Sequence, residues 1–212
     1  MAAEDTLAAA SALAAAAYGS GLAQHWALAL RALVRTAALG ALAVCAYVSG
    51  APAPLIAGLV LSAVGDACLA VESPAWRRPA LGAFVAAAVC YGWLFAEVGG
   101  GRPVLAAEPA RILGVLAAAA AGIAIAAQAW PVFKQAHAAI GVATAAVCGM
   151  AAASFTLPLR MWPAILAGGV FVSAYALAMA VPFRSSESNG LSRLGWALYY
   201  AGQALTTWAF LR

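Results

Sequence analysis

The chain has 212 residues, of which 66% are hydrophobic and 8% are charged, and its formal net charge is +4. This composition excludes a soluble globular protein, because a soluble domain of this length needs far more polar residues to cover its surface. The sequence also lacks the alternating pattern of a membrane β-barrel. We therefore expect an all-α polytopic membrane helix bundle, with residues 1–212 forming a single integral membrane domain.

Pro, Gly and charged residues divide the apolar sequence into eight segments of about 20 residues, the length that a helix needs to cross a bilayer. The eight expected spans lie near residues 5–24, 31–49, 52–72, 78–98, 108–128, 131–153, 161–182 and 191–211. Glu4 and Asp5 make the start of the chain acidic, unlike a secretory signal, so the first segment is expected to be a retained helix. Five tryptophans near span ends are expected at the headgroup level: Trp26, Trp76, Trp130, Trp162 and Trp196.

The eight-span topology places seven Lys and Arg residues on one side of the membrane and four on the other. The richer side contains Arg31, Arg35, Arg77, Arg78, Lys134, Arg184 and Arg193. The positive-inside rule predicts that this side is cytoplasmic. We expect an integral membrane protein, located in a bacterial inner (cell) membrane. No run of basic residues suggests a nucleic acid partner, so the expected partners are lipids.

The cysteines and histidines do not predict a metal or redox site. Cys45, Cys68, Cys90 and Cys148 fall in separate spans, form no C-x-x-C pair, and are expected to be free, buried thiols. The two histidines have no ligand spacing to each other or to a carboxylate. No metal or cofactor is expected, and the sequence leaves the oligomeric state open.

Asp66 most needs an explanation, because it lies inside the otherwise uncharged apolar run 52–71. A carboxylate at the bilayer centre costs roughly 2.5–3.5 kcal/mol on insertion scales, and it usually persists where it faces protein or water and has a task. Gly58, Ser62 and Asp66 recur every four residues and share one helical face, where the Ser62 hydroxyl can donate to the carboxyl. Burial opposes ionisation, so Asp66 is predicted to act as a general acid. A structural carboxyl bonded to a neighbouring helix is the alternative.

Polar residues in three other spans are candidates to surround Asp66. Tyr91 lies in the fourth span, and Tyr199 and Gln203 lie one turn apart in the eighth. Ser173 is expected at a similar depth to Asp66, because the third and seventh spans run in the same direction and the two residues lie about equally far along them. An interfacial belt of aromatic residues is the alternative explanation for Tyr199 and its neighbour Tyr200.

Four short segments combine these candidates with glycines and aromatic residues. They are Ser62-Ala-Val-Gly65-Asp66-Ala-Cys-Leu69, then Gly82-Ala-Phe84 followed by Tyr91, then Gly168-Gly-Val-Phe171-Val-Ser173, and finally Leu198-Tyr199-Tyr200-Ala-Gly-Gln203-Ala-Leu205. In this order and spacing, from about Arg35 to the C-terminus, the chain resembles the YhhN-like lysoplasmalogenase family of multi-span membrane proteins. The resemblance implies an eight-helix bundle that hydrolyses the vinyl ether bond of lysoplasmalogens to a fatty aldehyde and a glycerophospho-headgroup alcohol.

The chain departs from the pattern of this family at three positions. Ala174 stands where the family has an Asp after Ser173, Ala88 stands where it has a His, and Arg35 begins a pair that is Lys-Pro in the family. One of two family acids is therefore missing, and Asp66 is the remaining catalytic candidate. The implied substrate-binding residues are Ser62, Tyr91, Ser173, Ala174, Tyr199 and Gln203. The implied partner is a lysophospholipid or ether-lipid substrate.

Hydrolysis of a vinyl ether begins with proton transfer to carbon, after which water captures an oxocarbenium-like cation. Two carboxyl groups can divide these roles, as they do in glycosidases, whereas here Asp66 has to deliver the proton and then stabilise the cation as a carboxylate. Two other functions remain open. One is a non-catalytic lipid-binding membrane protein that has lost the second acid, and the other is a small proton-coupled transporter in which Asp66 titrates.

Overall fold

The computed structural model describes residues 2–20, 26, 28–71, 74–131, 136–180 and 188–212, and within these residues all regular structure is helical. The long helices are α1 (Ala2–Gly19), α2 (Leu28–Val48), α3 (Ala53–Ala70), α4 (Pro74–Val98), α6 (Ala110–Ala129), α7 (His137–Ser154), α8 (Trp162–Ala180) and α9 (Ser188–Leu211). A short helix, α5 (Gly101–Ala107), and a 3-10 helix, η2 (Leu159–Met161), lie in two connections. The predicted all-α fold is confirmed.

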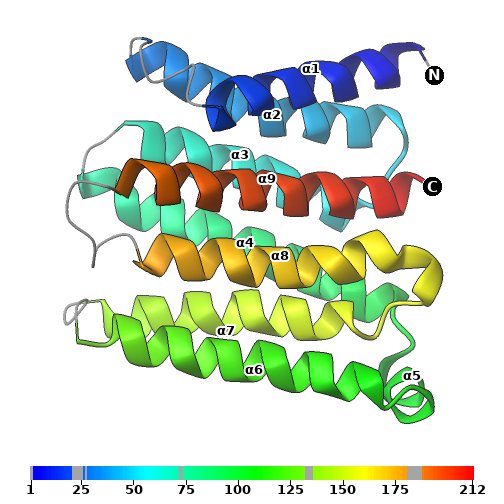
Figure 1. The fold of residues 1–212 in the computed structure, drawn as a ribbon. Helices are drawn as coiled ribbons and strands as arrows, with labels where there is room; N and C mark the ends of the chain where they lie inside the picture. The colour runs from blue at the N-terminus through cyan, green and yellow to red at the C-terminus, as the bar shows by residue number, and fades with distance from the viewer. Residues whose placement is uncertain (1, 21–25, 27, 72–73, 132–135, 181–187) are drawn as a thin grey trace.

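The long helices pack in two layers of four (Figure 1). One layer consists of α2, α3, α4 and α7, and the other consists of α1, α9, α8 and α6, in that order. Between the layers, α2 packs against α1 and α9, α7 packs against α6 and α8, and side chains of α3 and α4 contact α9. The first residues of α2, α4 and α9 lie at the same end of the bundle as the last residues of α1 and α3.

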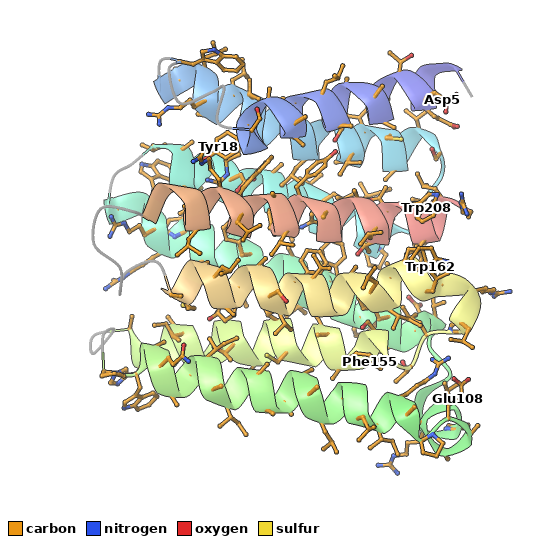
Figure 2. The ribbon with its side chains drawn as sticks, viewed as in Figure 1. Asp5, Tyr18, Glu108, Phe155, Trp162 and Trp208 are labelled. Atoms are coloured by element: carbon orange, nitrogen blue, oxygen red, sulfur yellow. The ribbon has the colours of Figure 1, made fainter. Side chains whose placement is uncertain are left out.

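Labelled aromatic residues mark the two ends of the bundle in Figure 2. Tyr18 belongs to the last turn of α1 and lies at the side of the bundle where α3 also finishes. We call this side of the bundle the Tyr18 end. Trp162 and Trp208 lie at the opposite end, where their rings pack edge to face with centroids 5.7 Å apart. This position of Trp162 agrees with the expected place of an indole ring near a span end.

The predicted spans overlap the long helices, with the largest differences at their ends. The predicted span 131–153 corresponds to α7, which begins only at His137, and the predicted span 5–24 corresponds to α1, which ends at Gly19. The predicted ends that fall at 21–24, 72, 132–135 and 181–182 lie outside the described residues. The sequence pattern does not predict α5, because its Gly-rich and Pro-containing start is typical of a turn.

Six helical segments of the described residues are long and apolar enough to cross a membrane, namely α2, α3, α4, α6, α7 and η2 with α8. The expected count of about eight is not confirmed, because α1 and α9 are long enough but less apolar. Polar residues explain this, since α1 begins with Glu4 and Asp5 and α9 contains Arg193. Large apolar side chains, such as Trp93 and Ile123, are exposed on the bundle, as a lipid-facing surface requires. The chain is an integral membrane protein.

Two glycines of α3 allow α4 to approach closely. A Cβ at Gly58 would lie 2.5 Å from Tyr91 Cε1, and a Cβ at Gly65 would lie 2.7 Å from Phe84 Cε1. The two rings therefore occupy space that larger side chains on α3 would fill. This is the packing through small residues that is common between membrane helices, and it sets Tyr91 directly against α3.

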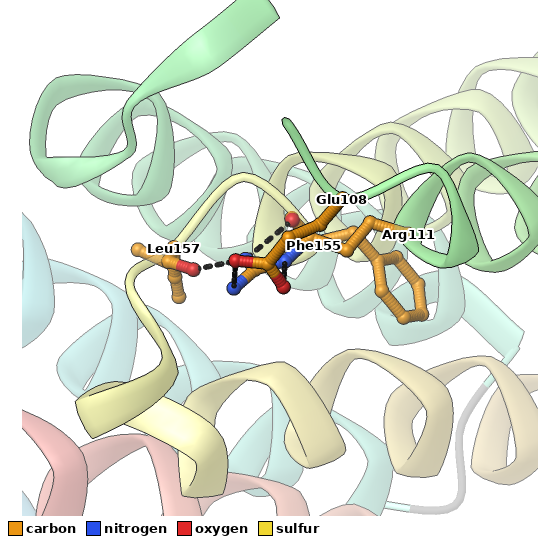
Figure 3. Close-up of polar contacts among 4 residues, drawn as sticks. All are labelled: Glu108, Arg111, Phe155 and Leu157. Carbon is orange, nitrogen blue, oxygen red and sulfur yellow. Dashed lines mark hydrogen bonds and ion pairs between the residues drawn. The ribbon is translucent and has the colours of Figure 1, made fainter. Parts of the chain in front are cut away.

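At the end opposite Tyr18, Arg111 of α6 ties down the connection between α7 and α8 (Figure 3). Its Nη1 donates to Phe155 O at 3.0 Å and also to Leu157 O, and its Nε donates to Glu108 Oε2 at 2.8 Å. Arg111 itself is buried. These contacts satisfy backbone carbonyls beyond the end of α7, so the role of Arg111 is structural.

Candidate functional site

Asp66 is fully buried, and donors from two other helices hold its carboxylate. Arg35 Nε donates to Oδ1 at 2.9 Å, and Arg35 Nη2 lies 2.6 Å from the same oxygen. Trp196 Nε1 donates to Oδ2 at 3.2 Å. Helices α2, α3 and α9 thus meet at this carboxylate. Because a guanidinium stays protonated in proteins, these contacts favour the ionised form of Asp66, whereas the full burial of the carboxyl group opposes its ionisation.

Two aromatic rings lie together on one side of the Arg35 guanidinium. Its Cζ lies 5.6 Å from the ring centroid of Tyr18 and 5.9 Å from that of Trp196, and the two rings are 4.5 Å apart. Such positions allow a cation–π attraction, which stabilises a cation that has lost part of its water. The Arg35 side chain keeps 20% of its surface exposed, whereas Asp66 keeps none. The cation is therefore the outer member of the ion pair.

A chain of hydrogen bonds lies one helical turn deeper, where α3, α4 and α9 each contribute one buried residue. Gln203 Nε2 donates to Ser62 Oγ at 2.9 Å, and Tyr91 Oη donates to Gln203 Oε1. Both ends of the Gln203 amide are bonded, so its orientation is fixed. Ser62 was expected to donate to Asp66, but its recorded partner is Gln203, and Asp66 is bonded to Arg35 and Trp196 instead.

Tyr199 supplies a buried hydroxyl that has no hydrogen-bond partner within the described structure. The hydroxyl lies beside Ser62 and Gln203. The Tyr199 ring is held by edge contacts with Phe84, at 5.7 Å, and Phe171, at 6.2 Å. A buried polar group left unbonded costs about 1–3 kcal/mol. A substrate atom or a water molecule at this place would satisfy it.

The two predicted residues of the seventh span point in different directions. Ser173 is exposed on α8, and its Oγ donates to Gly169 O of its own helix at 2.9 Å. Ser173 therefore does not point into the buried cluster, because counting residues along a helix gives a depth but not a direction. Ala174 is buried, and its carbonyl oxygen lies 3.7 Å from where a Cβ of Gly195 would be. Ala174 is therefore on the face of α8 that packs against α9.

Arg35 and Trp196 complete the site, although the sequence pattern predicts other positions for them. Arg35 was interpreted as a charge of the cytoplasmic surface, and Trp196 as a ring at the headgroup level. Both interpretations are corrected, because both side chains turn inward to Asp66. The sequence did contain a signal for the position of Arg35. This residue lies inside an apolar span, where its charge needs a buried partner just as the charge of Asp66 does.

The cluster offers a buried carboxylate that can exchange a proton, beside hydroxyl and amide groups that can orient water. Among the described residues, no group of three or more His, Cys, Asp or Glu is arranged to hold a metal ion. The four cysteines are free thiols. Within this cluster, Asp66 is the residue that can carry acid–base chemistry.

The model of the YhhN family matches residues 30–210. This range includes Arg35, Asp66 and the other residues of the site, except Tyr18 of α1. The comparisons with curated proteins and with solved structures gave no match. The family match covers most of the chain and confirms the resemblance carried by the four short segments. On this finding, the chain belongs to the YhhN family.

Proposed function

We propose that the protein is a lysoplasmalogenase-like hydrolase of a bacterial inner membrane, which cleaves the vinyl ether bond of a lysophospholipid. The observation that carries the proposal is the buried carboxylate of Asp66, bonded to Arg35 and Trp196 inside the range matched by the YhhN family. An intramembrane acid that faces the interior of a bundle usually has a function. The reaction consumes one water and gives a fatty aldehyde and a glycerophospho-headgroup alcohol.

The first step is proton transfer from the protonated form of Asp66 to the alkenyl carbon farther from the ether oxygen. The electron pair of the double bond forms the new C–H bond, and positive charge develops on the carbon bonded to oxygen. The group left behind is the carboxylate that Arg35 and Trp196 hold. These donors stabilise the product of proton transfer, and the carboxylate stabilises the adjacent cation.

In the second step, water adds to the cationic carbon and gives a proton to the Asp66 carboxylate, which restores the acid. The resulting hemiacetal collapses to the aldehyde and the alcohol. Tyr199 supports this step, because its hydroxyl is buried and unbonded beside Ser62 and Gln203, where it can hold the water or the ether oxygen. One carboxyl group acts here first as acid and then as base, whereas two groups share these roles in glycosidases.

Release of aldehyde from a lysoplasmalogen by the purified protein tests the proposal, with Asp66→Asn as the main variant. The amide keeps the size of the acid but cannot deliver a proton to carbon, so release should fall about 100-fold or more while binding of the lysolipid persists. Glu97→Gln is the matched control, because Glu97 is an exposed carboxylate of α4, and it should leave the rate unchanged. Equal rates for Asp66→Asn and the unmodified chain would show that the acid is wrongly assigned.

A second variant, Ala174→Asp, restores the acid that the family pattern has at this position. Ala174 is buried on the face of α8 that meets α9, so a carboxylate there can share the work of stabilising the cation and orienting water. Aldehyde release should increase. Ala174→Asn is the control of equal size, and it should give no increase, because the amide carries no negative charge.

A non-catalytic lipid-binding protein is the second candidate function, and the alanine at position 174 favours it. In that case every variant binds lysolipid, but none releases aldehyde, including Ala174→Asp. A proton-coupled transporter is distinguished by a third result, in which substrate drives proton uptake into vesicles, Asp66→Asn abolishes the uptake, and no aldehyde forms.

A further inference from the structure

The Arg35 guanidinium has hydrogen-bonding capacity that the ion pair does not use. A guanidinium carries five N–H donors in a planar fork. The contacts to Asp66 involve Nε and Nη2, and within the described residues no hydrogen bond to Nη1 is formed. Asp66 therefore occupies one edge of the cation and leaves donors of the other edge available.

Arg35 is the outer member of the ion pair. The Arg35 side chain is 20% exposed, whereas the Asp66 side chain is fully buried. Arg35 lies seven residues after the first residue of α2, and Asp66 lies four residues before the last residue of α3. At 1.5 Å per residue these depths are about 10 Å and 6 Å from the helix ends, so both residues lie in the half of the bundle at the Tyr18 end.

We infer that Arg35 binds the phosphate of the lipid substrate through this outer edge while it remains bonded to Asp66. The inference rests on the proposed function, since it takes a lysophospholipid as the ligand. A phosphate is the anion that a guanidinium fork matches best, because two parallel N–H donors can reach two of its oxygens. Tyr18 and Trp196 pack together on one side of the guanidinium and limit the movement of the fork.

This arrangement aligns the reacting bond with the acid. In a lysoplasmalogen only the glycerol backbone separates the phosphate from the vinyl ether. A phosphate on the outer edge of Arg35 therefore brings the ether close to Asp66. Ser62 lies one turn deeper than Asp66 on α3, and the Tyr199 hydroxyl of α9 lies beside Ser62. Arg35 thus selects a phosphorylated lipid and positions it, and Asp66 supplies the chemistry.

The test compares two ligands that the enzyme cannot cleave, a 1-O-alkyl lysophospholipid and the 1-O-alkylglycerol with the same chain. The unmodified protein should bind the lysophospholipid about 10-fold more tightly or better, as expected for a charge-assisted hydrogen bond. Asp66→Asn should keep this preference, because the guanidinium is retained. Arg35→Gln combined with Asp66→Asn should bind both ligands equally, and this neutral pair avoids leaving an unpaired buried charge, which destabilises a fold strongly.

Three results would overturn the inference. The first is a double variant that still binds the lysophospholipid more tightly than the alkylglycerol, or an unmodified protein that binds the two ligands equally. The second is an equal loss in Arg78→Gln, which removes an exposed charge near the start of α4 at the same end of the bundle, since the preference would then reflect general surface charge. The third is displacement of the lysophospholipid by inorganic phosphate at an equal concentration, which would assign the site to free phosphate.

The two proposals fail in distinguishable ways, because these ligands report binding and not turnover. An Arg35-dependent preference for the phosphorylated ligand without any aldehyde release from lysoplasmalogens would refute the hydrolase and keep the phosphate site. Aldehyde release without such a preference would refute the phosphate site alone.

Discussion

Substitution of Gly58 by alanine tests how tightly the site is packed. The new Cβ would lie 2.5 Å from Tyr91 Cε1 and 2.6 Å from Cζ, whereas ordinary carbon contacts are about 3.5–4.0 Å. The ring would have to move by about 1 Å. It has little freedom to do so, because its hydroxyl is bonded to Gln203 and its faces stack near Phe95 and Phe171, with centroids 6.5 Å and 6.0 Å away.

The expected loss of stability follows from three contributions. Overpacking of a core costs about 1–3 kcal/mol, and loss of the Tyr91–Gln203 hydrogen bond adds about 0.5–1.5 kcal/mol. The alanine gains about 0.5–1 kcal/mol over glycine from its helix propensity. We therefore expect the free energy of unfolding of Gly58→Ala to fall by about 0.5–4 kcal/mol, and aldehyde release to fall with it, because Gln203 loses its fixed orientation.

Unfolding by SDS in mixed micelles, followed by tryptophan fluorescence, measures this change. Gly82→Ala is the matched control, because a Cβ at Gly82 meets nothing within 4 Å and the residue is exposed on α4. The control should be as stable as the unmodified protein or slightly more so. If Gly58→Ala unfolds at the same SDS fraction as Gly82→Ala, the close contact between α3 and α4 is not as described.

Three further predictions concern other parts of the bundle. Arg111→Met should lower the free energy of unfolding by about 1–3 kcal/mol in the same assay, because the carbonyls that Arg111 binds lose their donor. Arg102→Met, which changes an exposed arginine, should leave the stability unchanged. Equal effects of the two substitutions would contradict the structural role of Arg111. Tyr91→Phe should reduce aldehyde release and destabilise the bundle by about 1 kcal/mol, because it leaves Gln203 Oε1 without a donor. An unchanged rate of aldehyde release would show that this hydrogen bond does not contribute to catalysis. Reporters fused at the two ends of α4 should lie on opposite sides of the membrane, with the first end cytoplasmic, and a finding of both on one side would contradict the topology.

The positions of the helices along the chain could be predicted well, because apolar length and the Gly, Pro and charge between spans are local properties of the sequence. The number of membrane helices could not, since α1 and α9 mix apolar stretches with polar residues such as Glu4 and Arg193. Their place in a bilayer depends on the neighbours that cover those residues, and single-segment patterns do not contain that information.

The buried position of Asp66 could also be predicted, because the cost of a charge in an apolar span does not depend on the details of packing. Its partners could not, since they depend on the rotation of each helix. Ser173 and Ala174 show this directly, because they are adjacent in sequence and one is exposed while the other is buried. For Trp196, proximity to a span end favoured the headgroup level, but the contact of α9 with α2 turned the ring inward.

Two hydrogen bonds of the site join residues that are 130 and 141 positions apart, which has a consequence for the biogenesis of the protein. Arg35 and Asp66 belong to early helices and can pair as soon as α2 and α3 have entered the membrane. Trp196 and Gln203 arrive only with the final helix. Until then Ser62 and Tyr91 lack the amide that joins them, so a chain that ends before α9 carries its acid without the groups that orient it. Completion of the site is thus coupled to the completion of synthesis, and an aldehyde-forming activity would not be expected from an unfinished chain.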